Sequence, residues 1–288
     1  MRKPIDFSQV IEEINEQGDS KTIEVDELDP SEVHRAEPYY QYFEKDTIKL
    51  LFSKKWQNKE DGYKKINHEL KTLLKEESDK GEDSGGHMIS FKQKKQEWIK
   101  LVISCIERGI NDKIIHVKLH ALELLKTLIE DENIKFLDVQ NSDNIFKFLI
   151  DGLSEHNLRL KEKFENSLHW VISTKTSDFY NLLIQILNKP PNKNKPLQKY
   201  NYSKLNFLTN SIEREMAEDG QLQKIDRTKS DPFFNEFLDF ISSITKKEKA
   251  ITKEVKEGIE KAIIVAYKYT SYDRIKDYIK EMDQVVLK

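Results

Sequence analysis

The chain has 288 residues, 37% of them hydrophobic and 34% charged, with a net charge of −3 and a mean hydropathy of −0.71. This balance gives no overall basic surface of the kind that nucleic acid favours, and no apolar run reaches the roughly 20 residues that span a bilayer. The single cysteine, Cys105, can form no internal disulfide, which indicates a reducing compartment. So little apolar material favours an elongated array of amphipathic helices over one thick core.

The chain begins with a mixed and acidic segment, residues 1–38, which we expect to be an irregular lead-in. One short helix is expected within it over residues 6–14, capped by Asp6 or Ser8. The N-terminus becomes acidic soon after its start and lacks an apolar signal core, so we expect a cytoplasmic protein. The aromatic segment EPYYQYF that follows is expected to pack on the first helices of the main body.

From residue 39 to residue 288, apolar residues recur at the spacing of helices, and none of these runs alternates as a strand would. Short breaks such as GINDK and SEHN alternate with longer polar breaks such as NKPPNKNKPLQK, which indicates helical hairpins stacked side by side. We therefore predict an all-α solenoid of about six HEAT-like hairpins. The apolar stripes cover residues 48–52, 63–73, 98–106, 117–128, 145–149, 160–171, 205–216, 234–241, 255–266 and 275–282.

A repeat underlies these stripes. The run from Val117 has apolar or small residues at offsets +4, +7, +8 and +11, and the run from Val255 has the same offsets. Asp112 and Glu155 each stand five residues before the first apolar residue of a second helix, Val117 and Leu160. We expect these acids to cap the second helices near their positive ends. Recurrence at a period of roughly 40 residues is typical of HEAT-type arrays.

The segment FSKKWQNKEDGYKKINHEL, residues 52–70, resembles the first repeat of TOG domains, the tubulin-binding HEAT arrays of microtubule regulators. In that family the first intra-repeat turn carries a serine, basic residues and an exposed tryptophan, followed by an acid and a small residue. The segment DGLSEHNLRLKEKFENSLHWVI resembles the family's third repeat, and the resemblance covers about residues 40–286. The chain is most similar to the single-TOG proteins of centrosomes and ciliary tips. The matching positions of the first turn are Ser53, Lys54, Lys55, Trp56, Asp61 and Gly62.

The resemblance implies a flat paddle whose intra-repeat turns form one edge that binds αβ-tubulin. It also implies a place on the cytoskeleton, at cilia or centrosomes, where other ciliary or centrosomal proteins are further partners. Because tubulin is strongly acidic, basic side chains at the turns would speed encounter and fix the register, and a tryptophan would supply an anchor. The predicted tubulin contacts are Trp56, Lys54, Lys55, Lys59, Lys113, Asn157, Arg159, Lys161, Lys199, Tyr200, Lys204, Lys246 and Lys247.

Each of these residues also has a structural interpretation. Trp56 could fold over the end of its hairpin as a hydrophobic lid, and each lysine could be an ordinary solvated charge. The chain departs from the family's pattern in NKPPNKNKPLQKYNYSK and TKKEKAITK, so contacts in the fourth and fifth repeats are the least defined. Trp98 and Trp170 lie within apolar stripes and are predicted to be core. The alternative function is a general HEAT scaffold that holds a helix or peptide in an apolar groove between repeats.

Catalysis finds little support in the sequence. His116 and His120 lie four residues apart on one helix, but HVKLH lacks the glutamate of zinc-protease motifs and no third ligand is apparent. The segment GEDSGGH has neither the spacing nor the lysine of a phosphate-binding loop. We therefore predict no cofactor, no metal, no nucleic-acid or membrane partner, and no enzymatic activity.

Overall fold

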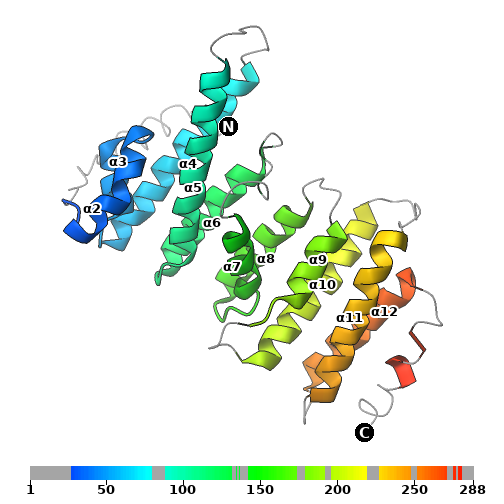
Figure 1. Cartoon of the computed structure of the whole chain (residues 1–288). Coiled ribbons are helices and arrows are strands. Elements are labelled where there is room, and N and C mark those ends of the chain that lie inside the picture. Colours follow the sequence, from blue (N-terminus) through cyan, green and yellow to red (C-terminus); the bar gives the residue numbers. More distant parts are fainter. Residues whose placement is uncertain are drawn as a thin grey trace, which may run out of the picture. The chain divides into compact units, whose positions relative to one another are not determined.

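The computed structural model describes residues 27–79, 88–131, 134, 136, 142–173, 179–191, 196–218, 227–247, 252–270, 275–276 and 278–280. The regular elements of these residues are all helical, which confirms the predicted all-α class. The chain divides into two compact units, residues 1–62 and 63–288. Figure 1 labels the helices of both units. The helix expected over residues 6–14 lies outside the described residues. Within the described part, none of the helices is both long and apolar enough to traverse a bilayer.

The first unit contains a helix where the sequence predicted an irregular lead-in. Helix α2 (Pro30–Ala36) forms because Asp29 caps it, with its Oδ1 accepting a hydrogen bond from the Ser31 amide at 2.9 Å. Pro30, at the first helical position, has a φ suited to a helix start. The interpretation of these residues as irregular is therefore wrong. The other elements of this unit are η1 (Glu37–Gln41), α3 (Lys45–Leu51) and the first turns of α4 (Trp56–Asp79).

The aromatic segment packs as predicted. Tyr39 and Phe43 are buried, and the Tyr39 ring meets the ring of Phe52, just after α3, with centroids 5.4 Å apart. Helix α4 begins close to α3, because a Cβ at Gly62 would lie only 2.7 Å from the Leu51 backbone nitrogen. A glycine is therefore required where these two helices meet.

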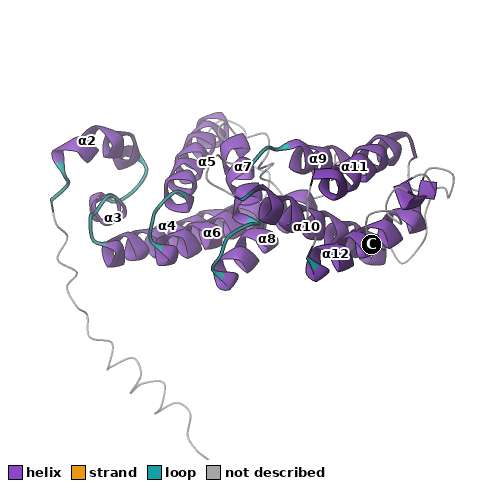
Figure 2. Cartoon of the chain, turned by 90° about the horizontal axis from the view of Figure 1, so that it is seen from below, coloured by secondary structure: helices purple, strands orange, loops and turns teal. Residues whose placement is uncertain are grey.

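The second unit is built from pairs of helices. The first helices of the pairs lie in one layer and the second helices in another, with neighbouring pairs side by side (Figure 2). Four pairs lie in the described part of this unit, and α3 with α4 makes one more, against the roughly six predicted. The pairs are α5 (Met88–Ile110) with α6 (Ile115–Ile129), α7 (Ser142–Gly152) with α8 (Leu158–Ser173), α9 (Phe179–Asn188) with α10 (Leu197–Glu218), and α11 (Arg227–Lys247) with α12 (Lys253–Tyr269).

Two features recur in successive hairpins. Helices α6 and α8 begin 43 residues apart, at Ile115 and Leu158, which agrees with the predicted period. The first helix of each of these pairs carries a glycine, Gly109 or Gly152, where an added Cβ would overlap neighbouring side chains. These glycines let the two helices of a hairpin approach closely beside the turn that joins them.

The core residues largely follow the predicted stripes. Cys105 and Trp98 are buried, as predicted, and the Cys105 carbonyl accepts a hydrogen bond from the Tyr63 hydroxyl at 2.7 Å. Trp170, also predicted to be core, is only half-buried, and the Lys126 ammonium lies 5.1 Å from the centroid of its ring. Helix α9 was not among the predicted stripes, although Leu182, Leu183, Ile186 and Leu187 form one buried face with helix spacing.

Candidate functional site

Three hairpin turns of the second unit lie next to one another. A hollow of about 460 Å³ between the α5–α6 turn and the start of α8 is lined by Lys113, Asn157 and Arg159, together with apolar residues of α6. The α7–α8 turn in turn meets the start of α10, since the Lys199 ammonium lies 2.8 Å from His156 Nδ1. The structure therefore brings together four of the predicted site residues along one edge, which we call the turn edge.

The turns are closed by side chains, but not by those that the sequence predicted. Asp112 Oδ1 accepts from the Ile114 amide at 2.9 Å, while Ile114 itself holds the cap position of α6 and makes no side-chain capping bond. Asn157 Oδ1 accepts from the Leu160 amide at 3.0 Å and so caps α8. The prediction that Asp112 and Glu155 cap these helices is wrong, because both acids lie two residues too early in the turn.

Asn157 thus has a structural task in addition to its predicted role. Glu155, predicted as the cap of α8, instead accepts from the His156 amide through its Oε1 at 2.8 Å. These short bonds fix the backbone on either side of His156, which positions the start of α8 at the turn edge.

The turn edge carries two positive charges that no acid among the described residues neutralises. Lys113 and Arg159 are exposed, and among the described residues neither forms an ion pair with an acid. Lys161 differs, because its ammonium lies 3.5 Å from Glu165 one turn further along α8. The hollow therefore offers two cations to an acidic partner.

The tryptophan turn belongs to the first unit. Trp56 is the first residue of α4 and is 37% exposed, so its side chain is neither buried in the core nor fully exposed to solvent. Ser53 Oγ closes the turn by accepting from the Lys55 amide at 3.1 Å and from the Asn58 side-chain amide at 3.2 Å. Lys59 lies half-exposed within the first turn of α4.

Lys54 has an internal partner. Its ammonium lies 2.6 Å from Asp29 Oδ2, at the start of α2. The hydrogen bonds from Lys54 and from Ser31 hold the pKa of Asp29 well below its usual range, and the same carboxylate raises the pKa of Lys54. Because the pair is exposed to water, it contributes little stability, but it offsets the positive charge of Lys54.

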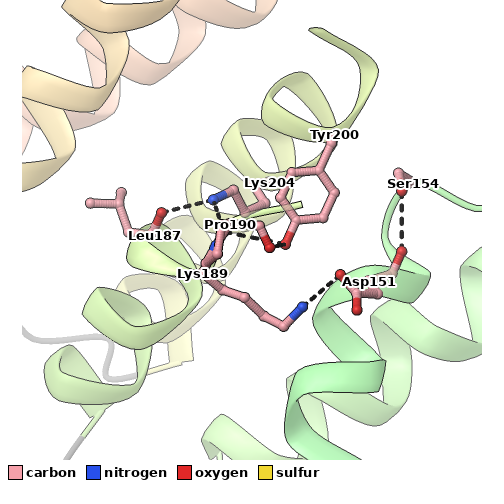
Figure 3. Close-up of polar contacts among 7 residues, drawn as sticks. All are labelled: Asp151, Ser154, Leu187, Lys189, Pro190, Tyr200 and Lys204. Carbon is pink, nitrogen blue, oxygen red and sulfur yellow. Dashed lines mark hydrogen bonds and ion pairs between the residues drawn. The ribbon is translucent and has the colours of Figure 1, made fainter. Parts of the chain in front are cut away.

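Two predicted contact residues are buried inside the second unit. Lys204 is 2% exposed, and its ammonium donates to the carbonyls of Leu187 and Lys189 at 2.7 and 2.9 Å (Figure 3). Tyr200 is fully buried, and its hydroxyl donates to the carbonyls of Lys189 and Pro190. The prediction that Lys204 and Tyr200 meet a partner is contradicted by this burial. Both instead satisfy carbonyls that lack helical partners at the end of α9.

A nearly buried ion pair adjoins these residues. The Lys189 ammonium lies 2.7 Å from Asp151 Oδ1, and this contact joins the end of α7 to the segment after α9 (Figure 3). Asp151, Lys189, Tyr200 and Lys204 form what we call the buried polar cluster. The ion pair of this cluster connects two neighbouring hairpins, because Asp151 lies at the end of α7 and Lys189 follows α9.

The stability contributed by Lys204 is expected to depend on pH. Burial, followed by the positive charge of Lys189, lowers the pKa of Lys204 to about 8 from 10.5. Between these values the unfolded chain holds more protons than the folded protein, so the folded protein gains stability as pH rises. From pH 7.5 to pH 9.5 the free energy of unfolding of the wild type should rise by about 2 kcal/mol relative to Lys204→Met.

Urea unfolding of both proteins at the two pH values measures this difference. The Lys204→Met variant lacks the titrating group but keeps every other one. Subtracting its free energy of unfolding from that of the wild type therefore cancels the pH dependence of the remaining chain. A difference that stays constant or falls as pH rises would contradict the assignment.

The remaining predicted contacts lie at the surface. Lys199 is half-exposed beside His156, and Lys246 is exposed near the end of α11. The side chain of Lys247 lies outside the described residues. Within the described part of the chain, no group of three histidine, cysteine or acidic residues is placed to hold a metal ion.

Sequence reasoning missed the apolar part of the turn edge. Ile114, Ile115, Leu158 and Leu197 are large hydrophobic residues that the fold leaves exposed at the turns. Ile115 and Leu158 each stand two residues before the first core residue of a second helix, Val117 and Leu160. This position, two residues before the buried stripe begins, is the feature of the sequence that could have identified them as exposed.

Comparison with known proteins gives similarity at the level of structure. No family model matches the sequence, and no curated relative is similar to it in sequence. The solved TOG domain of human Cep104 has a TM-score of 0.60 and 15% identity, covering 88% of this chain and 89% of that one. A second structure, described as the CEP104 TOG domain, has a TM-score of 0.61 and 13% identity, covering 88% and 90%. The chain therefore has the fold of a TOG domain, as its resemblance in sequence predicted.

Proposed function

We propose that this chain is a tubulin-binding module that regulates microtubule ends and acts by binding rather than by catalysis. One observation carries the proposal: on a fold shared with TOG domains, the turn edge presents Lys113 and Arg159 around a hollow, and no acid of the described chain neutralises them. An acidic partner would be drawn to these cations and oriented by them. Tubulin is such a partner.

The first unit supplies its own proposed contact. Trp56 stands at the start of α4 with its ring partly exposed, and tryptophan is enriched among residues that dominate binding energy. Lys55 and Lys59 flank it. Lys54 contributes less in this conformation, because Asp29 already binds its ammonium.

The proposed contact set is narrower than the sequence predicted. Tyr200 and Lys204 leave it because they are buried. Lys246 and Lys247 stay in it as the proposed contacts of the fifth repeat. The other retained residues are Trp56, Lys55, Lys59, Lys113, Asn157, Arg159, Lys161 and Lys199.

We place this activity at cilia or centrosomes. The resemblance of the sequence to single-TOG proteins of those structures supports the location. A single module of this kind would bind tubulin weakly, so it would act with other domains or by association with further ciliary or centrosomal proteins, since avidity strengthens weak binding.

Gel filtration with soluble αβ-tubulin tests the proposal. The wild type should co-elute with tubulin, and Lys113→Glu/Arg159→Glu and Trp56→Glu should each weaken binding more than about tenfold. Charge reversal at the hollow acts on the second unit, and Trp56→Glu acts on the first. The two changes therefore test the two contacts separately.

Tyr267→Glu is a matched control for both variants. Tyr267 is 54% exposed on α12 and stands away from the hairpin turns, so introducing a carboxylate there should leave tubulin binding unchanged. Circular dichroism would establish that all variants fold. Variants that fold normally and bind tubulin like the wild type would exclude binding through the turns.

The alternative function, a general HEAT scaffold that holds a helix or peptide in an apolar groove, is less well supported than tubulin binding. Between α9 and α11 lies a hollow of about 430 Å³, lined by Leu187 and Phe240 but also by Glu236 and Asp239. Glu236 binds the Asn188 side chain at 2.8 Å, and Asp239 accepts from the Tyr278 hydroxyl at 2.6 Å. Such a polar hollow is a poor match for the apolar face of a helix.

A further inference from the structure

Three second helices of the second unit begin with a large exposed apolar residue. Ile115 opens α6, Leu158 opens α8 and Leu197 opens α10, and Leu158 is 81% exposed. We call these three residues the apolar row. Trp56 holds the same first position in α4, within the first unit.

The members of the row are neighbours along the turn edge. The 460 Å³ hollow is lined by Ile115 and by Asn157 and Arg159, the two residues that flank Leu158. The contact between Lys199 and His156 brings the start of α10, where Leu197 lies, to the turn before Leu158. The row therefore follows three successive turns without a break.

The needs of helix formation do not explain the row. An apolar residue that stabilises a helix start normally precedes the cap and packs against the fourth helical residue. Ile115 and Leu158 instead follow the cap residues Ile114 and Asn157, and both remain exposed. A single exposed leucine on a protein surface is ordinary. Exposed apolar residues at the same position of successive repeats form a regular row, which is not a chance distribution.

The charges around the row indicate what covers it. Lys113 and Arg159 border it without acidic partners among the described residues, and Lys199 borders it at the α10 end. A complementary surface has apolar side chains at its centre and carboxylates at its rim. Interfaces in general place apolar anchors centrally and charges peripherally.

We infer that the apolar row anchors the same tubulin surface that the cations of the turn edge attract, and that the row sets how long the complex lasts. This inference rests on the proposed function and assigns different tasks within it. The cations govern the association rate and register, which salt weakens. The row governs dissociation, which depends little on salt.

The test compares Leu158→Ser with Ile264→Ser in binding to soluble αβ-tubulin, at low and at raised salt. Ile264 is 56% exposed on α12, so the control removes a similar apolar side chain away from the turns. We expect Leu158→Ser to raise Kd about tenfold, mainly through faster dissociation. Ile264→Ser should bind like the wild type, and Leu158→Met should restore affinity.

Salt separates the row from the cations. The loss caused by Leu158→Ser should stay the same at raised salt, whereas the loss caused by Lys113→Glu/Arg159→Glu should shrink. Because Leu158 is so exposed, the thermal midpoint of Leu158→Ser should match that of the wild type.

Three outcomes would overturn the inference, and they differ. Wild-type affinity in Leu158→Ser, together with loss of binding in the charge-reversal variant, would refute the row and leave the proposed function standing. A wild type that binds no tubulin would refute both. A wild-type dimer that Leu158→Ser converts to a monomer would show that a second copy of the chain covers the row.

Discussion

Replacing Gly152 with alanine is expected to lower the free energy of unfolding by about 3 kcal/mol, because the new methyl group has no space. A Cβ at this position would overlap three carbon atoms of the Phe164 ring. Phe164 is buried, so its ring cannot swing into solvent. Helices α7 and α8 would have to move apart, which would disturb the turn that carries Asn157 and Leu158. Urea unfolding measures the loss.

A double-mutant cycle with Phe164→Leu isolates the cause. The smaller side chain should relieve the overlap, so Gly152→Ala/Phe164→Leu should lose at least about 1 kcal/mol less than the sum of the single losses. Strictly additive losses would show that the glycine is needed for another reason. Tubulin binding should fall together with stability in Gly152→Ala and recover in the double variant.

The sequence predicted the helix pairs well because burial imposes a period that can be read directly. Val117 and Leu160 start equivalent stripes, and both are buried at the predicted positions of α6 and α8. The same method missed α9. Its buried residues Leu182, Leu183, Ile186 and Leu187 have helix spacing, but the helix has only 10 residues, and a short apolar run is also compatible with a buried strand.

The candidate site was harder to predict because exposure depends on neighbours far away in sequence. Lys204 is polar and lies among other basic residues, so it was predicted to be at the surface, yet the end of α9 needs donors for its last carbonyls. Leu158, for which no prediction was made from the sequence, shows the opposite case. An apolar residue beside a core stripe suggests burial, but its place at the first position of α8 turns it outward.

The caps show a third limit, which is local. Asp112 and Glu155 are acids near helix starts, as the electrostatics of a helix end favour. Capping geometry, however, requires the residue immediately before the helix, and the sequence alone places helix starts only to within a few residues. Asn157 was singled out as a contact residue, and its capping bond was not predicted.

Removing the carboxylate of Asp151 should destabilise the protein by about 3 kcal/mol or more, because Lys189 would keep its charge without a partner. The side chains of this pair are only 9% and 13% exposed, and their atoms lie 2.7 Å apart. Asp151 also favours the charged form of Lys204, whereas Lys189 opposes it. In Asp151→Ala the two ammonium groups would therefore repel each other with no compensating negative charge.

The exposed pair Lys253–Glu257 on α12 provides the matched control. Its side chains are 86% and 63% exposed and its atoms lie 3.7 Å apart, so Glu257→Ala should change stability by no more than about 0.5 kcal/mol. The double variant Asp151→Leu/Lys189→Met removes both charges and should recover most of the loss of Asp151→Ala.

The same pair connects stability to the turn edge. Asp151 lies at the end of α7, three residues before the turn residue Ser154, whose hydroxyl donates to the Asp151 carbonyl at 3.1 Å. Loss of the ion pair should therefore loosen the α7–α8 turn. Tubulin binding should then weaken by more than the unfolded fraction of the protein accounts for. Binding measured well below the thermal midpoint separates these effects. If Asp151→Ala costs no more than Glu257→Ala, the buried polar cluster does not hold the hairpins together.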